Sequence, residues 1–395
     1  MKYNHSFSAA NILLPKSNFT AWATIACDQY TSEPEYWEEV KKAAANNPSA
    51  LNIVLPEAYL SVDNSEKINI INQNMQEYLD NGIFEEYADS LIFVERIQSD
   101  GKCRRGIVGK IDLESYDYRP GTTAEIRATE QTVLSRIPPR VEIRKNAPLE
   151  LPHVMLLFDD VQDSVFSYLI DNKNRFEKVY DFTLMCNAGS ITGYLLDDEA
   201  KGVVLSLLDD LKQQNNGFLF CVGDGNHSLA TAKECYSLNQ TEASRYALTE
   251  IVNIHDEALQ FEPIYRVVFD INPEDLINEF VKATGEGNQK FTCVYGDVVR
   301  EISVKPTAKL AVGTLQTFLD NYVKEHAGAE IDYIHGEASL KKLASRPNAV
   351  GFIFDGMQKS ELFEAVNADG SLPRKTFSMG HADDKRFYIE ARKIK

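Results

Sequence analysis

The segment from Phe218 to Lys233 constrains the fold of this chain more than any other. It begins with the apolar run Phe218–Val222, passes through a short polar stretch that contains two glycines, and continues into helix-forming residues. This order is typical of a strand, a tight loop and a helix. Strands that alternate with helices along a chain predict a protein of the α/β class.

The loop of this segment holds the first candidate site, which consists of Gly223, Asp224, Gly225, Asn226, His227 and Ser228. The glycines permit a sharp turn and a close approach of the backbone to a ligand. The polar side chains stand where the first amides of the helix have no intrahelical partner, so the loop suits a phosphate, a metal ion or both. A purely structural role is the alternative, since Asp or Asn before a helix is also a common N-cap.

Asp28 occupies a similar position near the N-terminus. It follows the apolar run Ala21–Ala26 and precedes a helix that we expect to begin near Pro34. Two strand ends could then present Asp28 and Asp224 to one crevice, as in ligand sites of open α/β sheets. Asp28 is the first candidate for the base that deprotonates a hydroxyl group. His227 is the alternative base, because the positive end of a helix lowers the pKa of a histidine.

Two further segments offer ligands for an anion. A helix is predicted over residues 124–137, which would place Arg127 and Glu130 one turn apart. Arg127 suits bidentate recognition of a phosphate or carboxylate, although a surface salt bridge explains the pair equally well. Arg374 and Lys375 form a second possible anion clamp in a segment rich in hydrogen-bond donors, with a solvated strand end as the alternative.

Helix and strand patterns extend along the whole chain. Residues 67–78 predict an amphipathic helix, and residues 91–97 and 105–111 predict a β-hairpin around Asp100 and Gly101. We therefore expect mixed sheets, in an α/β or α+β arrangement.

A soft domain boundary is placed near residue 268. Residues 1–268 would form an N-terminal α/β domain that carries the Asp28 and Asp224 loops. Residues 269–395 would form a C-terminal α/β region that folds back onto the site.

Composition limits the possible partners. The 395 residues carry a formal net charge of −18, which argues against a nucleic-acid partner because such binding depends on phosphate neutralisation by Lys and Arg. No apolar run approaches the length of a membrane span, and the first residues lack the order of a signal peptide, so we expect no membrane association and a cytoplasmic location. The expected partner is a small anionic metabolite or nucleotide. The oligomeric state is left open.

Several motifs together resemble one known family. The loop at residues 223–228 is close to an Asp-Gly-His-His-Arg signature, and similar motifs occur at residues 26–32, 127–130, 261–266 and 372–380. On these segments, which run nearly from end to end, the chain resembles the uncharacterised family labelled domain of unknown function 1015. The chain departs from the family pattern at Asn226 and Ser228, which suggests a different substrate.

The same loop also resembles one in the ParB and sulfiredoxin-like superfamily, which includes nucleotide-dependent serine kinases. This resemblance implies a ParB/sulfiredoxin-like core with large insertions and a C-terminal α/β region. In the serine kinases an N-terminal acidic residue acts as the base, which points to the segment around Asp28.

The leading functional hypothesis is a Mg²⁺-dependent phosphotransferase or phosphatase that acts on a small hydroxylated metabolite, with serine or O-phosphoserine first. Asp224 and Asn226 would hold Mg²⁺, and ADP or ATP is a possible second ligand. Arg127 and Lys375 would neutralise phosphate charge. The alternatives are a sensor that binds a nucleotide or metabolite without chemistry, and a hydrolase that uses His227 with Asp224.

Overall fold

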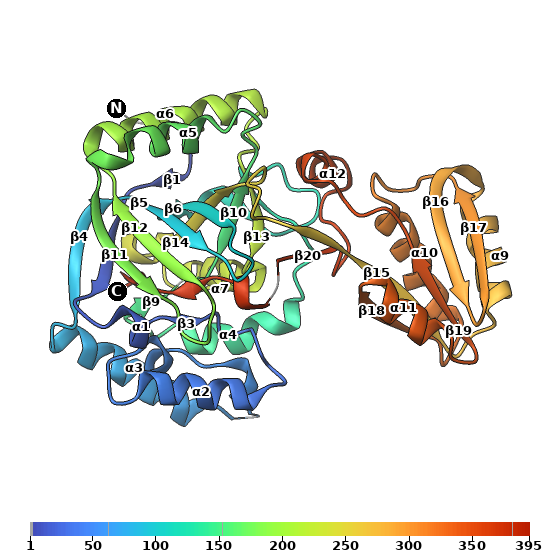
Figure 1. Ribbon diagram of the computed structural model, residues 1–395, viewed down its shortest axis with the longest axis horizontal. Helices are drawn as coiled ribbons and strands as arrows, with labels where there is room; N and C mark the ends of the chain where they lie inside the picture. Colours follow the sequence, from blue (N-terminus) through green and yellow to red (C-terminus); the bar gives the residue numbers. More distant parts are fainter. Residues whose placement is uncertain (1–2, 62, 152, 381) are drawn as a thin grey trace.

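A large mixed sheet forms the centre of the larger of two bodies (Figure 1). The computed structural model of the protein describes residues 3–61, 63–151, 153–380 and 382–395. The strand order in the sheet is β11 (Glu177–Thr183), β12 (Ser190–Leu195), β5 (Ile92–Ile97), β6 (Cys103–Asp112), β14 (Tyr246–Asn253), β10 (Met155–Phe158), β13 (Phe220–Asp224), β8 (Ile126–Ala128) and β7 (Tyr116–Asp117), and β1 (Phe7–Ser8) pairs with β6. Parallel and antiparallel pairs coexist, which confirms the predicted mixed α/β class.

Both faces of this sheet are covered. Alternate side chains of a strand point to opposite faces, and here both sets are buried. Phe93 of β5 packs in the core on one face, and its neighbours Ile92 and Val94 pack in the core on the other. In Figure 1 two groups of helices lie above and below the sheet. The upper group is α5 (Ser164–Asn172) and α6 (Asp198–Gln214), and the lower group is α1 (Phe19–Trp22), α2 (Pro34–Ala44) and α3 (Ser65–Asp80).

Two local predictions are confirmed. The predicted hairpin is formed by β5 and β6, which pair antiparallel with Ile97 opposite Cys103. The helix predicted over residues 67–78 is α3, which buries Ile71 and Met75. These elements depend on side-chain periodicity that a short window of sequence already contains.

A second, smaller sheet forms the other body. Its strands, in spatial order, are β17 (Val298–Val304), β16 (Glu286–Tyr295), β19 (Ala349–Ile353), β15 (Phe261–Phe269) and β18 (Glu330–His335), and β20 (Phe377–Met379) pairs with the start of β15. Its core includes side chains from α9 (Pro273–Thr284), α10 (Ala311–Glu325), α11 (Glu337–Ala344) and α12 (Leu362–Asp369). Figure 1 shows β15 reaching from one body to the other.

The C-terminal segment returns to the larger body. It adds two short antiparallel pairs there, β21 (Phe387–Tyr388) with β3 (Thr24–Ile25) and β22 (Arg392–Lys393) with β9 (Leu149–Glu150). A third small pair in this body joins β2 (Ala10–Pro15) to β4 (Phe84–Ser90). The boundary that we place near residue 268 falls within β15, and the division into two domains stays a prediction.

The prediction of a helix over residues 124–137 is wrong. Residues Ile126–Ala128 form strand β8, where Arg127 lies opposite Cys221 of β13. Pairing with a buried strand overrides the local helix pattern. The helix in this region begins later, as α4 (Ile137–Arg144), with two prolines in its first turn.

The remaining helices are α7 (Asn226–Leu238) and the short α8 (Glu242–Arg245). α4 packs against α7. None of the helices in the described part of the chain combines the length and the apolar character that crossing a bilayer requires.

Candidate functional site

The predicted strand, loop and helix around Asp224 are present as β13, Gly225 and α7. Gly225 adopts a left-handed conformation with φ of 82°, which favours glycine. A side chain there would also be crowded, because a Cβ would lie 3.0 Å from the Cα of Val154. The sharp turn places the unpaired amides of the first turn of α7 at the end of the strand, as an anion-binding helix terminus requires.

This helix terminus opens into a polar cavity of about 770 Å³. The cavity receives residues from both bodies, including His335 of β18 and Lys385 of the returning C-terminal segment. It brings together most of the predicted site residues, namely Asp28, Glu130, Gly223, Asp224, Gly225, Asn226, His227, Ser228 and Lys375. The residues named from four separate sequence motifs thus meet in one place.

Asp28 lies against a histidine that the sequence did not single out. The Oδ2 atom of Asp28 is 3.7 Å from Nε2 of His153, and the hydroxyl of Ser228 is 3.2 Å from the same nitrogen. The other ring nitrogen of His153 is 3.0 Å from the hydroxyl of Tyr388. Burial opposes ionisation of Asp28, but the neighbouring His153, Gln29 and Lys385 outweigh it and lower the pKa of Asp28. A carboxylate in this state can accept a proton from a substrate hydroxyl.

Asp224 and Asn226 line the cavity side by side. Asp224 accepts a hydrogen bond from the amide of Gly225 at 2.9 Å and lies 3.5 Å from Nζ of Lys385. The amide nitrogen of Asn226 donates to the hydroxyl of Thr129 at 3.4 Å, whereas its Oδ1 atom is buried without a partner. A buried oxygen without a partner is costly, so Asn226 fits a role as a ligand to a cation or donor.

Asp224 and Asn226 can hold the predicted Mg²⁺ only if further oxygen ligands complete its coordination. Among the described residues, no group of three or more His, Cys, Asp or Glu side chains is arranged to hold a metal ion. Mg²⁺, however, often binds through one or two protein carboxylates, while water and substrate phosphate oxygens occupy its remaining coordination positions. Asp224 and the free Oδ1 of Asn226 meet that smaller requirement.

Glu130 joins the predicted C-terminal motif to the cavity. It is half-buried and accepts a hydrogen bond from the amide of Thr376 at 3.3 Å. Burial raises the pKa of Glu130 although backbone amides of the motif stabilise its charged form. The role predicted for Glu130 as a partner of Arg127 on a helix is therefore replaced by a contact with residues far along the chain.

Arg266 fixes the backbone that carries Lys375. Its guanidinium donates hydrogen bonds to the carbonyl oxygens of Arg374 and Lys375, both at 3.1 Å, and to Gln316 at 2.6 Å. Lys375 adopts φ of 53°, which is uncommon for a residue with a side chain. Arg266 of the motif at residues 261–266 therefore positions the backbone of the motif at residues 372–380.

Two predicted anion ligands lie outside the cavity. Arg127 is buried, its guanidinium stacks 3.9 Å from the ring of Phe218, and it bonds to Ala124 and Asn367. Arg374 is exposed and faces Tyr333 and Asp320. The structure gives both arginines protein partners and does not bring them to the Asp224 loop.

Several cavity residues were missed by sequence reasoning, namely Glu57, Thr129, Arg136, Arg140, His153 and Lys385. Arg136 and Arg140 belong to a locally basic stretch of the chain, and Glu57 pairs with Arg140. His153 and Lys385 lie in stretches with no distinctive spacing. A search for isolated His and Lys residues next to predicted short strands could have proposed them, but other residues would have met the same criterion.

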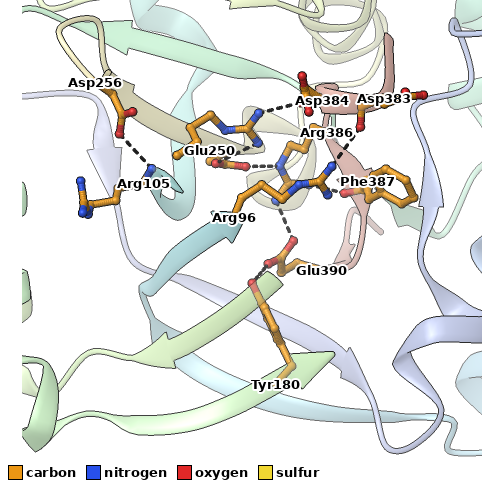
Figure 2. A network of polar contacts seen from close by, with 11 residues as sticks. Arg96, Arg105, Tyr180, Glu250, Asp256, Asp383, Asp384, Arg386, Phe387 and Glu390 are labelled. Atoms are coloured by element: carbon orange, nitrogen blue, oxygen red, sulfur yellow. Dashed lines mark hydrogen bonds and ion pairs between the residues drawn. The ribbon is translucent and has the colours of Figure 1, made fainter. Parts of the chain in front are cut away.

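Lys385 reaches the cavity because its neighbours are held by a buried ion network (Figure 2). Arg386 donates hydrogen bonds to Glu250 at 2.7 Å and to Glu390 at 2.6 Å, and Figure 2 shows the two glutamate side chains converging on Arg386. Arg96 and Arg104 donate to the carbonyl oxygens of residues 383 and 384. The network fixes the backbone on both sides of Lys385.

His227 is the subject of a first prediction. Burial, and then the nearby charges of Arg140 and Arg136, lower the pKa of His227 to about 4. Its Nε2 atom accepts a hydrogen bond from the amide of Val133 at 3.3 Å, as a neutral imidazole can. The shift has the predicted direction, but burial and the two arginines cause it. We expect His227 to stay neutral at physiological pH and to gain a proton only as the pH falls toward 4.

The measurement is a ¹⁵N NMR titration of the histidine side chains, with His227 assigned by its loss in His227→Asn. A midpoint near 6.5, the ordinary value of a histidine, would contradict the prediction.

Comparisons with known proteins agree with the sequence motifs. Residues 9–393 match the family described as protein of unknown function (DUF1015), and the chain belongs to this family, as predicted. No curated protein matches the chain.

Solved structures with some likeness include a free serine kinase in complex with AMP, at 12% identity and a TM-score of 0.41, covering 72% of this chain and 90% of that chain. A conserved hypothetical protein from Pyrococcus furiosus is 13% identical with a TM-score of 0.37, covering 72% of this chain and 94% of that chain. SbnI with a C-terminal truncation, from Staphylococcus aureus, is 9% identical with a TM-score of 0.37, covering 69% and 82%. The ParB/sulfiredoxin-like core stays a prediction at such scores.

Proposed function

We propose that the protein is a Mg²⁺-dependent phosphotransferase that acts on a small hydroxylated metabolite. The observation that carries this proposal is the meeting of three features in one cavity: the N-terminus of α7, the carboxylate of Asp28 with its lowered pKa, and the basic residues Lys375 and Lys385. Phosphoryl transfer requires mainly positioning and neutralisation of charge, which such a set supplies.

Each group has a role in this proposal. The amides after Gly225 and the two lysines bind the phosphate oxygens. Asp28 takes the proton of the acceptor hydroxyl as the acceptor oxygen bonds to the transferred phosphorus. The bond from that phosphorus to the bridging oxygen of ATP or ADP breaks at the same time, and ADP or AMP leaves with that oxygen. His153 orients the Asp28 carboxylate. Asp224 and Asn226 would hold Mg²⁺, which when bound neutralises phosphate charge. ADP or ATP is the expected carrier of the phosphoryl group, and phosphatase activity would use water in place of the acceptor.

Serine and O-phosphoserine are the first substrates to test, because the loop at residues 223–228 resembles that of nucleotide-dependent serine kinases. Phosphorus NMR of the purified protein with Mg²⁺ and O-phosphoserine, without nucleotide, with AMP or with ADP, separates the possibilities. New ADP from AMP, or new ATP from ADP, means phosphotransfer run in reverse, and free phosphate without nucleotide means a phosphatase. No reaction removes serine as the substrate and favours the sensor described next.

A sensor that binds a nucleotide or metabolite without chemistry is the second candidate. It is favoured by one observation, namely that both bodies line the cavity and β15 connects them. A ligand held there would contact both bodies at once and could change their arrangement. Small-angle X-ray scattering with and without ADP tests this, and calorimetric binding without turnover of any hydroxylated acceptor would support it.

Lys385 carries a second prediction. Removing its charge in Lys385→Met should weaken binding of inorganic phosphate roughly tenfold or more, because a charge-assisted hydrogen bond contributes about 1.5–3 kcal/mol. Isothermal titration calorimetry measures the loss. Lys305→Met, which removes an exposed lysine outside the cavity, is the matched control and should bind phosphate like the unmodified protein. Equal affinity in both variants would remove Lys385 from the proposed phosphate site.

A further inference from the structure

A second chamber, of about 170 Å³, adjoins the polar cavity. The two spaces share Cys27, Glu57, Arg140, His153 and Ser228 as a common wall. Beyond that wall the chamber is lined mainly by hydrocarbon side chains, among them Ile53, Leu55, Met75, Ile143, Leu229 and Leu248. It therefore lies directly behind the groups that face Asp28.

The polar groups in the wall of this chamber already have partners. Thr231 donates to the carbonyl of His227 at 2.7 Å, and Glu150 is paired with Arg392 at 2.6 Å. Ser228 and Tyr388 both contact His153. Among the described residues, the buried polar side-chain atoms without a partner include none from this wall, whereas the polar cavity has Oδ1 of Asn226.

This contrast defines the chemistry of an occupant. A nucleobase or charged group placed in the chamber would leave its own polar atoms without partners, which disfavours binding. A hydrocarbon group would lose only its contact with water. The volume is close to the roughly 150 Å³ at which an apolar cavity in another protein binds benzene.

We propose that the chamber is a subsite for an apolar group of about six carbons, carried by the same ligand whose phosphate or hydroxyl end lies at Asp28 and the α7 terminus. The inference rests on the proposed function and narrows its substrate class to hydroxylated metabolites with an aliphatic or aromatic portion. Serine would leave the chamber empty.

The test uses ethyl, butyl and hexyl phosphate as probes, with binding to the full chain measured by isothermal titration calorimetry. Each methylene buried in an apolar site strengthens binding roughly fourfold. Hexyl phosphate should therefore bind at least about tenfold more tightly than ethyl phosphate, even if only two of the additional methylenes are buried. Equal affinities for the two esters would overturn the inference and leave the proposed function standing.

Two variants test whether the tighter binding of hexyl phosphate arises in the chamber. Ala232→Leu fills the chamber from α7, and Leu60→Lys places a charge at a lining residue that is 41% exposed and so tolerates substitution. Both should remove most of the gain for hexyl phosphate and leave ethyl phosphate unchanged, so that ethyl phosphate is the control within each variant. A gain that persists in both variants would overturn the inference. If Ala232→Leu fails to fold, Leu60→Lys decides alone.

A failure of the proposed function has a different signature. In that case neither ester nor inorganic phosphate would bind, and hexan-1-ol, which lacks the phosphate, would test the chamber by itself. Binding of hexan-1-ol that Leu60→Lys weakens would support the apolar subsite. No binding of hexan-1-ol would overturn it.

Discussion

Replacing Asp28 with Asn is expected to lower kcat for phosphoryl transfer roughly 100- to 10,000-fold, the usual contribution of a general base. The amide keeps the size of the carboxylate but cannot accept the proton of the acceptor hydroxyl. KM should change little, because the proposed phosphate ligands Lys375 and Lys385 and the loop amides are untouched. Steady-state kinetics with the substrate identified by phosphorus NMR provides the measurement.

The matched control is Glu35→Gln, which neutralises an exposed carboxylate in the first turn of α2 that does not line the cavity. It should retain full activity. Full activity of Asp28→Asn would instead assign the proton transfer to another group, with His227 next.

The pH dependence follows from the lowered pKa of Asp28. A base acts in its deprotonated form, so activity is present above that pKa and is lost as the pH falls through it. Because the pKa lies below the ordinary 3.8 of an aspartate, Asp28 should produce no acid limb in kcat/KM near neutral pH. An acid limb near pH 6.5 that disappears in a histidine variant would contradict this assignment.

Replacing Arg386 with Ala is expected to destabilise the protein by about 3–5 kcal/mol, because the change removes the cation that two buried carboxylates share. Arg386 is 4% exposed, and its partners Glu250 and Glu390 are almost fully buried. A fall in the midpoint of urea unfolding and in Tm measures the loss. Phosphate binding should also weaken, since Arg386 adjoins Lys385 in the segment that the network fixes.

The control for this prediction is Lys393→Met. Lys393 lies on the same C-terminal segment, and the substitution removes its exposed ion pair with Glu86. Exposed pairs contribute about 0–1 kcal/mol, so Tm should change little. A similarly small change in Arg386→Ala would show that the network does not stabilise the fold.

Lowering the pH should narrow the difference in Tm between Arg386→Ala and the unmodified protein. Burial opposes the charge of Glu250, but Arg104 and Arg386 outweigh it and lower its pKa. A lowered pKa stabilises the fold above the ordinary value of 4.5, and this contribution is lost as the pH falls through the lowered pKa. In the variant Glu250 has lost one of its cationic partners and can gain a proton at higher pH, which relieves the cost of its buried charge. Tm measured from neutral to acidic pH tests this convergence.

Much of the site could be predicted because its central loop is local. A glycine at 225 is required by the left-handed turn, and the polar residues beside it follow one another along the chain. The loop and its helix therefore depend on a short window of sequence. Asp28 could be proposed by the same reasoning, since it too follows an apolar run.

Other residues could not be placed because their environment is set by distant partners. Arg127 was expected on a helix and instead lies in a strand, where pairing with β13 and stacking on Phe218 decide its conformation. Its neighbour Glu130 meets Thr376, far along the chain. Local propensity is weaker than such burial and pairing.

The sequence by itself determined the mixed α/β class, the family, and the strand, loop and helix that carry Asp224. Only the tertiary structure decided which charges share the cavity. Lys385 and His153 reach it because β21 pairs with β3 and because buried arginines hold the C-terminal segment, which are contacts between residues hundreds of positions apart. Sequence periodicity records which face of an element is buried, but it does not record which distant element covers that face.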